Sequence, residues 1–210
     1  KITLNNFSYI MANVITIKKG LDINLKGKAP ESMLKAGKSA TYAIVPDYYT
    51  GIVPKVVVRP GDKVKAGSAL MTDKNRPEIK FVSPVSGEVV AVNRGEKRKV
   101  LSIVVKPDAQ IEYENFGKKN VSSLKAEEVK AELLNAGMWP FIKQRPYDIV
   151  ASPSDSPRDI FVTAFNSAPL APNFDFLVKG NEADLQAGLD ALAKLTNGKV
   201  YVGVKKGSSV

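Results

Sequence analysis

The chain of 210 residues is long enough for one large or two small domains, and its 44% hydrophobic content is typical of a globular protein. It contains no cysteine and no histidine, which excludes disulfides, thiolate zinc sites, iron–sulfur ligation, a cysteine nucleophile and a histidine base. The formal net charge of +10 favours an anionic partner, such as nucleic acid, anionic lipid or an acidic protein face.

Residues 1–10 precede Met11, where a more ordinary beginning takes over, and we treat them as an extension. The first twenty residues lack the apolar stretch and the cleavage site of a signal peptide. No run of about 18 uncharged apolar residues occurs. We therefore expect a soluble, cytoplasmic protein that meets a membrane only through a partner.

Valine- and isoleucine-rich runs between Ile44 and Val105 are separated by turn signals, which is typical of a β domain. The octapeptides 56–63 and 90–97 both read as a valine-rich strand that enters a turn containing glycine, an acidic residue and lysine. This internal repeat predicts a pseudo-symmetric small barrel or sandwich. The clearest predicted strands are 56–59, 79–82, 88–92 and 100–105.

The densest basic group lies in the second of these turns. Gly95 and Glu96 interrupt it, so it is predicted to be a solvated turn, and a positive surface facing an acidic partner subunit would account for the charge equally well. Its members are Arg94, Lys97, Arg98 and Lys99.

Helical patterns begin after Pro107. A helix is predicted at 124–136, with Ser123 as its N-cap and Gly137 as its stop. The proline-rich stretch 140–157 then predicts a connector. Strands are predicted at 160–165, 176–179 and 199–204, with a helix that is capped by Asn181 and ends at Asn197-Gly198. Strand, helix and strand in this order begin a parallel α/β sheet, and since one such unit cannot close a sheet, we expect a piece of a longer protein.

A series of short blocks, in a fixed order along the chain, points to a family. They are IKKGLD at 17–22, VRPGDKV at 58–64, DKN at 73–75 with KF at 80–81, SPVSG at 83–87, VNRG at 92–95, IFVTA at 160–164 and GLD at 188–190. From Met11 to about Lys206, the chain resembles the A subunits of Na⁺-translocating NADH:quinone oxidoreductases.

The resemblance implies an α+β protein of two domains. A barrel-sandwich hybrid domain, like that of lipoyl and biotinyl carriers, is expected at 11–106, and the first part of a Rossmann-like α/β domain at 147–210. A helical segment and connector are expected at 107–146. The resemblance further implies a peripheral subunit on the cytoplasmic face of the bacterial inner membrane, whose partners are the other subunits of the complex. NADH, flavins and iron–sulfur clusters are then expected on those partner subunits.

The segment after the helix 124–136 bears on cofactor binding. In flavin-binding relatives, a glycine-rich loop follows this helix and lets backbone N–H groups approach the flavin phosphate. Here only Gly137 remains, and Trp139, Pro140 and Phe141 fill the space and remove a donor. We therefore expect no flavin on this chain.

Large flat side chains in the same region raise a second hypothesis, that of a quinone pocket. Its candidate residues are Tyr48, Tyr49, Trp139 and Phe141. The simpler interpretation of these aromatics is a hydrophobic contact between domains, and it is favoured because aromatics near domain boundaries usually pack.

Two rival functions follow from other features. Lys74 lies in an Asp-Lys turn that is similar to the modified turn of lipoyl domains, so the chain could be a lipoyl or biotinyl carrier. Residues 75–78 lengthen the loop, however, and predict an unmodified lysine. A basic nucleic-acid-binding protein is favoured only by the net charge. Asp155 and Asp159 form a near acidic pair outside the predicted helices and are predicted to serve helix capping and solubility. We therefore predict no catalytic residue and no metal site.

Overall fold

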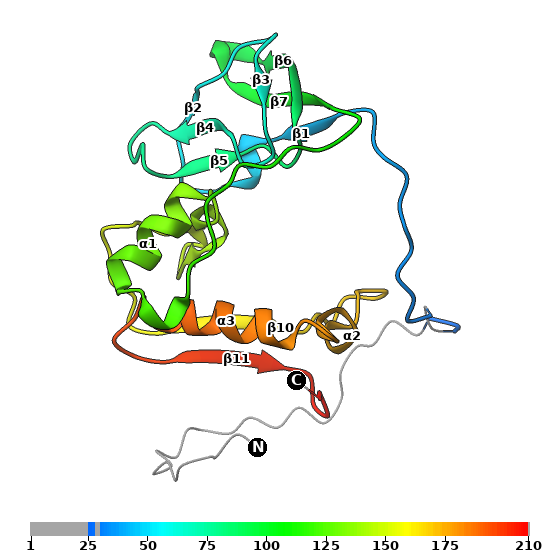
Figure 1. The fold of residues 1–210 in the computed structure, drawn as a ribbon, viewed down its shortest axis with the longest axis vertical. Coiled ribbons are helices and arrows are strands. Elements are labelled where there is room, and N and C mark those ends of the chain that lie inside the picture. Colours follow the sequence, from blue (N-terminus) through cyan, green and yellow to red (C-terminus); the bar gives the residue numbers. More distant parts are fainter. Residues whose placement is uncertain (1–24, 28–29, 210) are drawn as a thin grey trace.

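A computed structural model gives the structure of the chain at residues 25–27 and 30–209. The predicted extension 1–10 and the block 17–22 lie outside these residues. Two antiparallel β-sheets build the upper part of the molecule, with the strand orders β1-β7-β6-β3 and β2-β4-β5 (Figure 1). The strands of the first sheet are β1 (Tyr42–Ile44), β7 (Val100–Pro107), β6 (Gly87–Arg94) and β3 (Lys63–Val64). Those of the second sheet are β2 (Pro54–Val56), β4 (Ala69–Asp73) and β5 (Lys80–Val82).

One hydrophobic core joins the side chains of both sheets. Leu70, Met71 and Phe81 come from the second sheet, while Val89 and Ile103 come from the first, and each of them is at most 2% exposed. Burial of an apolar side chain of this size stabilises a fold by roughly 1.5–3 kcal/mol. The contact between the sheets therefore holds this half of the protein together, as the predicted sandwich requires.

Three of the four predicted strands are confirmed, since 79–82 corresponds to β5, 88–92 to β6 and 100–105 to β7. The prediction for 56–59 is wrong, because β2 ends at Val56. The N–H of Val57 still donates to the carbonyl of Leu70 in β4, and the chain then leaves the second sheet. The Asp62 carboxylate accepts the N–H of Arg59, and the N–H of Gly61 donates to the carbonyl of Val89 in β6. The valine-rich run thus crosses from one sheet to the other.

Gly87 allows β6 to begin directly beside the end of β7. It has a φ of +156°, and a Cβ built on it would lie 1.9 Å from the carbonyl oxygen of Lys106. Any larger residue would push the two central strands of the first sheet apart. The glycine of the SPVSG block is therefore required by strand packing.

The helix α1 (Ala126–Asn135) starts two residues later than predicted. Lys125 is its N-cap, and the Glu128 carboxylate accepts the Lys125 N–H at 2.7 Å. Ser123 instead belongs to the short 3₁₀ helix η3 (Val121–Ser123), where its hydroxyl donates to the carbonyl of Asn120, so its predicted capping role is wrong. The predicted stop is confirmed, because Gly137 has a φ of +68° directly after the helix.

The predicted connector differs from the observed structure. Residues within 139–150 form the 3₁₀ helix η4 (Trp139–Phe141) and the short strands β8 (Lys143–Gln144) and β9 (Ile149–Val150), which pair with each other. Trp139 and Val150 belong to the same core cluster as the two sheets. The segment is therefore packed on the first half of the protein, because its apolar side chains find a surface there that the local sequence does not reveal.

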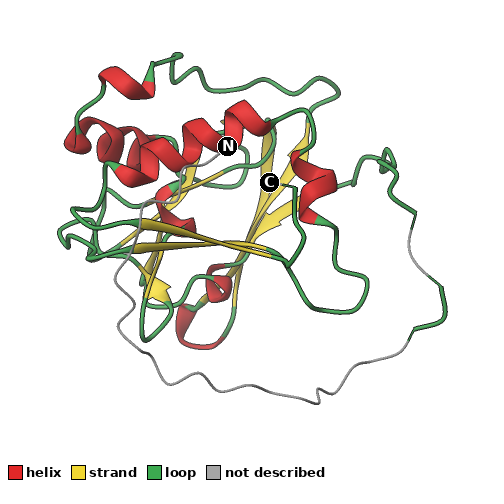
Figure 2. Ribbon diagram, turned by 90° about the horizontal axis from the view of Figure 1, so that it is seen from below, coloured by secondary structure: helices red, strands yellow, loops and turns green. Residues whose placement is uncertain are grey.

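The last third of the chain contains a parallel β–α–β unit, as predicted. Strand β10 (Ile160–Ala164) pairs in parallel with β11 (Val200–Val204), and α3 (Glu182–Ala193) connects them. The prediction of a strand at 176–179 is wrong, because α2 (Phe174–Val178) forms there and the side chain of Asn173 accepts the N–H of Asp175 at its start. The longest helices lie together on one side of the strands (Figure 2). Over the described ranges, no helix combines the length and the apolar character needed to cross a membrane.

Candidate functional site

The first two quinone candidates lie next to each other but in different surroundings. Tyr48 ends the 3₁₀ helix η1 (Pro46–Tyr48) and is 78% exposed. The ring of Tyr49 packs edge-on against Phe81, with ring centroids 4.6 Å apart. Burial raises the pKa of the Tyr49 hydroxyl above its usual value. Tyr49 therefore belongs to the rim of the core, whereas Tyr48 is available to a partner or ligand.

The other two candidates divide in the same way. Trp139 is 4% exposed, and its indole N–H donates to the carbonyl of Ala151 at 2.9 Å. Pro140 beside it is fully buried, while Phe141 is 67% exposed. Trp139 thus packs in the core, whereas Phe141 projects outward.

The segments that carry these aromatics flank β9 on its two sides. The N–H of Val150 donates to the carbonyl of Thr50, two residues after Tyr48, and Val150 also pairs with Lys143, two residues after Phe141. The backbone therefore brings the two segments to one region. The side chains of Tyr49 and Trp139 are packed there, so only Tyr48 and Phe141 present accessible rings.

A buried ion pair in this region was missed by the sequence reasoning. The Nε of Arg76 donates to the Oδ2 of Asp73 at 2.7 Å, and the Asp73 side chain is only 1% exposed. The Oδ1 of Asp73 accepts the N–H of Val53 at 3.1 Å. The terminal nitrogens of Arg76 donate to the carbonyls of Gly51 and Val150, at 2.9 and 3.1 Å. Arg76 therefore clamps the β4–β5 loop to the segments before β2 and within β9.

Only weak sequence signals marked this clamp, because an aspartate followed three residues later by an arginine is common in surface turns. The same loop carries Lys74, which is exposed and whose N–H donates to the carbonyl of Val53 at 2.7 Å. The loop closes through the N–H of Asp73, which donates to the carbonyl of Ile79. Its five intervening residues are more than the two of a tight hairpin tip.

Asp155 and Asp159 do not cap helices, so that expectation is wrong. The Asp159 carboxylate accepts the N–H of Lys199 at 3.0 Å and thereby joins the starts of β10 and β11. This backbone hydrogen bond, aided by the Arg158 guanidinium, lowers the pKa of Asp159 below its usual value. Asp155 accepts a hydrogen bond from the Gln144 amide. The described residues contain no group of three or more acidic side chains that could hold a metal ion.

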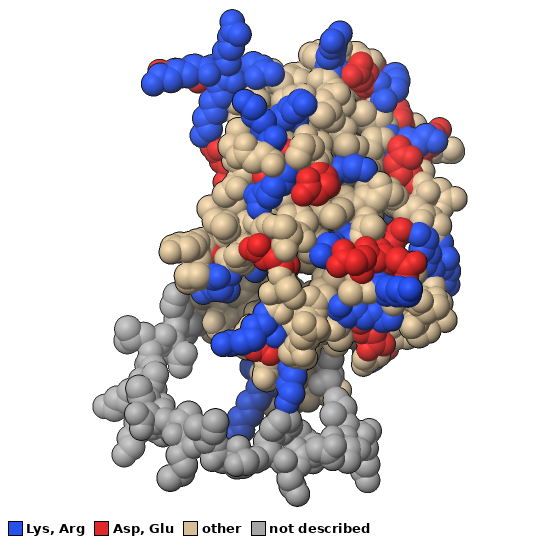
Figure 3. Space-filling view, turned by 90° about the vertical axis from the view of Figure 1, so that its left-hand side faces the viewer, with Lys and Arg blue, Asp and Glu red and all other residues tan. Residues whose placement is uncertain are grey.

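Charged side chains cover the surface unevenly. Lys and Arg alternate with Asp and Glu around the middle of the molecule, whereas Lys and Arg side chains project from the end that carries the β6–β7 hairpin (Figure 3). Exposed ion pairs neutralise part of the positive charge, as in Lys63–Glu88 and in Lys99–Asp47, the latter at the β6–β7 turn itself. The positive charge is therefore spread over the surface, with a local excess at the end that carries the β6–β7 hairpin.

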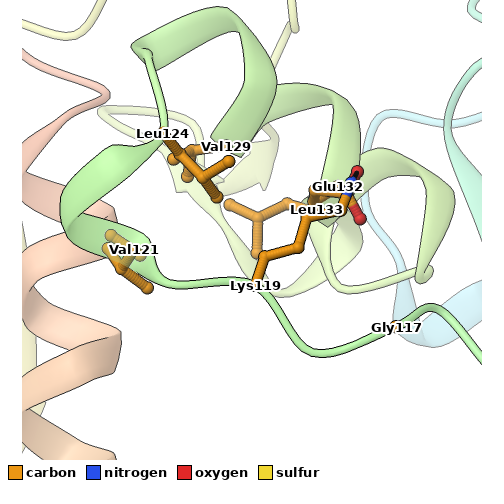
Figure 4. A pocket seen from close by; sticks show the side chains of 8 residues that line it. Gly117, Lys119, Val121, Leu124, Val129, Glu132 and Leu133 are labelled. Atoms are coloured by element: carbon orange, nitrogen blue, oxygen red, sulfur yellow. Dashed lines mark hydrogen bonds and ion pairs between the residues drawn. The ribbon is translucent and has the colours of Figure 1, made fainter.

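A small apolar hollow of about 210 Å³ lies between the segment 117–121, α1 and α3 (Figure 4). An ion pair between Lys119 and Glu132 lies at its edge. Its apolar lining comes from Val121, Leu124, Val129, Leu133 and Ala191. The hollow is separate from the aromatic region around β9, and its lining suits an apolar group rather than acid–base chemistry.

A second hollow of about 540 Å³ lies where β10 and β11 end. Small residues such as Ala168 and Ala171 line it, together with Lys205 and Lys206. In parallel α/β sheets, ligands usually bind beyond the carboxyl ends of the strands. The hollow therefore occupies the usual position for a ligand of such a sheet, although none of the quinone candidates lies there.

Comparison with known proteins identifies both halves of the chain. Residues 15–108 match the family model of the NqrA N-terminal barrel-sandwich hybrid domain, and residues 124–210 match that of the NqrA second alpha/beta domain. The fold is therefore the predicted α+β arrangement of two domains, with a barrel-sandwich hybrid first.

Relatives along nearly the whole chain support the same assignment. The A subunit of the Na(+)-translocating NADH-quinone reductase of Vibrio vulnificus (strain YJ016) is 40% identical over 200 residues, which are 94% of this chain and 44% of the relative. The corresponding A subunit of Photorhabdus laumondii is 37% identical over 198 residues, covering 93% of this chain and 44% of the relative. The chain thus spans less than half the length of these relatives. It belongs to the NqrA family, the A subunits of Na⁺-translocating NADH-quinone reductases.

Proposed function

We propose that the chain is the N-terminal part of a peripheral, cytoplasmic subunit of a Na⁺-pumping NADH:quinone oxidoreductase, in which it serves as a docking piece for the other subunits. The observation that carries the proposal is the match of both domains to one family, at 40% identity over 94% of the chain. The buried contacts of Arg76 and Trp139 support a firmly packed docking surface around β9. A rigid surface loses less conformational entropy when partners dock on it.

The experiment that tests this proposal is a chimera. Residues 15–209 of this chain replace the corresponding part of the Vibrio vulnificus relative, and the other subunits are co-expressed with it. We expect the chimera to co-purify with them and to restore Na⁺-dependent quinone reduction by NADH. A matched variant with Phe81→Asp, which places a charge in the core, should abolish assembly. A chimera that folds but neither assembles nor restores turnover would refute the proposal.

We further propose that the chain binds no flavin, metal, iron–sulfur cluster or covalent carrier group. The absence of cysteine and histidine removes the usual redox-metal ligands, and the buried Trp139 and Pro140 occupy the segment where a flavin phosphate would need free backbone donors. The purified chain should therefore show no flavin absorbance band in the visible range and no NADH turnover. Such a band or turnover above the blank would overturn this part.

The carrier alternative is less well supported by the loop around Lys74. A carrier lysine needs a hairpin tip that a modifying enzyme can recognise, whereas Arg76 and Asp73 hold this loop against Gly51 and Val150. Intact mass is the decisive measurement. The unmodified mass is expected, and an increment equal to lipoyl or biotin would establish the carrier function.

Nucleic-acid binding rests on the net charge alone. The densest basic group, at 94–99, contains no aromatic side chain on which a base could stack. We expect weak retention on DNA that disappears at moderate salt without sequence preference. Tight binding that survives such salt would favour this alternative.

We also propose that this chain lies close to the quinone. Tyr48 and Phe141 are the two candidates whose rings are exposed, on segments that flank β9, and they are accessible to a quinone held jointly with a partner subunit. Tyr49 and Trp139 would act by supporting those segments. In the assembled complex, Tyr48→Ala and Phe141→Ala should each raise the KM for quinone while leaving the melting temperature unchanged. An unaltered KM for quinone in both variants would show that quinone does not bind at this surface.

A further inference from the structure

The turn that joins β6 to β7 has an unusual residue at each of its two central positions. The N–H of Lys99 donates to the carbonyl of Glu96 at 3.0 Å, which closes a four-residue turn. Lys97 has a φ of 50° and a ψ of 29°, and Arg98 has a φ of 62°. Positive φ at both central positions defines a type I′ turn, in which Asn-Gly is strongly preferred. Here the two positions carry Lys and Arg.

The fold gives no reason for these two side chains. Both are exposed, and neither takes part in an ion pair with any residue of the described ranges. An L-residue with a branched or long side chain is strained in the left-handed conformation, whereas Asn and Gly adopt it readily. The turn therefore carries backbone strain together with two exposed cations, and such strain is commonly retained where a side chain serves a function.

The surroundings of the turn combine positive charge with an exposed apolar side chain. The Arg94 guanidinium donates to the carbonyl of Arg98 at 3.1 Å and so lies over the turn. Leu101 is 44% exposed and lies beside Gly95. Glu96 is the single acidic residue of the turn. Asp47 pairs with Lys99 at the end of the turn and leaves Lys97 and Arg98 without an acidic partner among the described residues. Lys and Arg side chains project from this end of the molecule (Figure 3).

We propose that the tip of the β6–β7 hairpin, formed by Arg94, Lys97, Arg98 and Leu101, contacts the anionic headgroups of a lipid bilayer. This inference rests on the proposed function, which brings the chain next to a membrane, and it departs from the expectation that the chain meets a membrane only through a partner. Cations that surround an exposed leucine match an interface in which charges meet phosphates and the apolar side chain enters the headgroup boundary. An acidic protein face would attract the same cations, and the test below separates it from a bilayer.

The test uses the chain and vesicles of phosphatidylcholine, with or without about 30% phosphatidylglycerol, at low salt. We expect sedimentation only with the anionic vesicles. The double variant K97N/R98G installs the preferred turn, so it should bind anionic vesicles at least about fivefold more weakly and yet melt a few degrees higher. A matched control, K35Q/K118Q, removes two exposed charges elsewhere and should keep most of the binding. The variant K97R/R98K exchanges the two side chains and keeps both charges, so it should bind anionic vesicles as well as the unchanged chain does.

Three outcomes would overturn the proposal. The chain fails to bind anionic vesicles at low salt, or K97N/R98G binds them as well as the unchanged chain, or the control loses as much binding as the tip variant. If K97N/R98G instead weakens co-purification with the other subunits while vesicle binding stays unchanged, the tip faces an acidic protein and the lipid assignment is wrong. Because the vesicle assay needs no partner protein, its result is independent of the chimera that tests the proposed function.

Discussion

Replacement of Arg76 by methionine tests the clamp between the β4–β5 loop and β9. The change removes one buried ion pair and two hydrogen bonds to backbone carbonyls, and it leaves Asp73 only 1% exposed without its counter-charge. Breaking a buried pair costs about 3–5 kcal/mol. Two backbone N–H groups, from Val53 and Asn75, still stabilise the carboxylate, so we expect about 3 kcal/mol. For a chain of this size, that lowers the melting temperature by about 6–12 °C.

Urea unfolding followed by the fluorescence of Trp139 measures this loss, because Trp139 is the only tryptophan and bonds to the carbonyl of Ala151, next to the clamp. The matched control is Arg145→Met, which breaks an exposed pair with Asp148 of the same spacing and should cost less than about 0.5 kcal/mol. The double variant Asp73→Asn/Arg76→Met should recover part of the loss, since it leaves no buried charge. If Arg76→Met is no more destabilising than Arg145→Met, the clamp contributes nothing and the argument fails.

Further predictions address the core, the strands, acid stability and the domain boundaries. Trp139→Ala should cost about 3–5 kcal/mol in urea unfolding followed by circular dichroism, because the side chain is 4% exposed, and an unchanged midpoint would favour the ligand hypothesis for Trp139. Gly87→Ala should lower the melting temperature strongly, since its Cβ would meet the Lys106 carbonyl, whereas Gly188→Ala in α3 has open space and should be neutral or stabilising. Because the pKa of Asp159 is lowered in the folded state, its contribution to stability is present above its unfolded pKa of about 4 and lost as the pH falls below it. The stability gap between the unchanged chain and Asp159→Asn should accordingly shrink below about pH 4, and a constant gap would exclude this linkage. Limited proteolysis should leave a core within 42–106 together with 139–151, and early cleavage inside β4 or β6 would contradict the domain assignment.

The sequence alone was sufficient for the features that depend on local patterns. Valine- and isoleucine-rich runs separated by turn signals predicted β5, β6 and β7, the internal repeat predicted a small barrel or sandwich, and the strand–helix–strand order predicted the parallel pair β10–β11. Gly137 was recognised as a helix stop because a left-handed residue is needed there whatever packs around it. The absence of cysteine and histidine also limited the chemistry without any structure.

Tertiary structure decided the features that depend on distant residues. Whether an aromatic side chain is a ligand contact or a core residue depends on what covers it, and only the fold brings Trp139 into the barrel core while leaving Phe141 in solvent. The short apolar run 176–179 is equally compatible with a strand or a helix, and a cap at Asn173 selects the helix. Arg76 is indistinguishable from a surface arginine in the sequence, because its acceptors at Gly51 and Val150 lie 25 and 74 residues away along the chain. Contacts of that kind arise only when the two sheets close, and so they could not be read from the order of the residues.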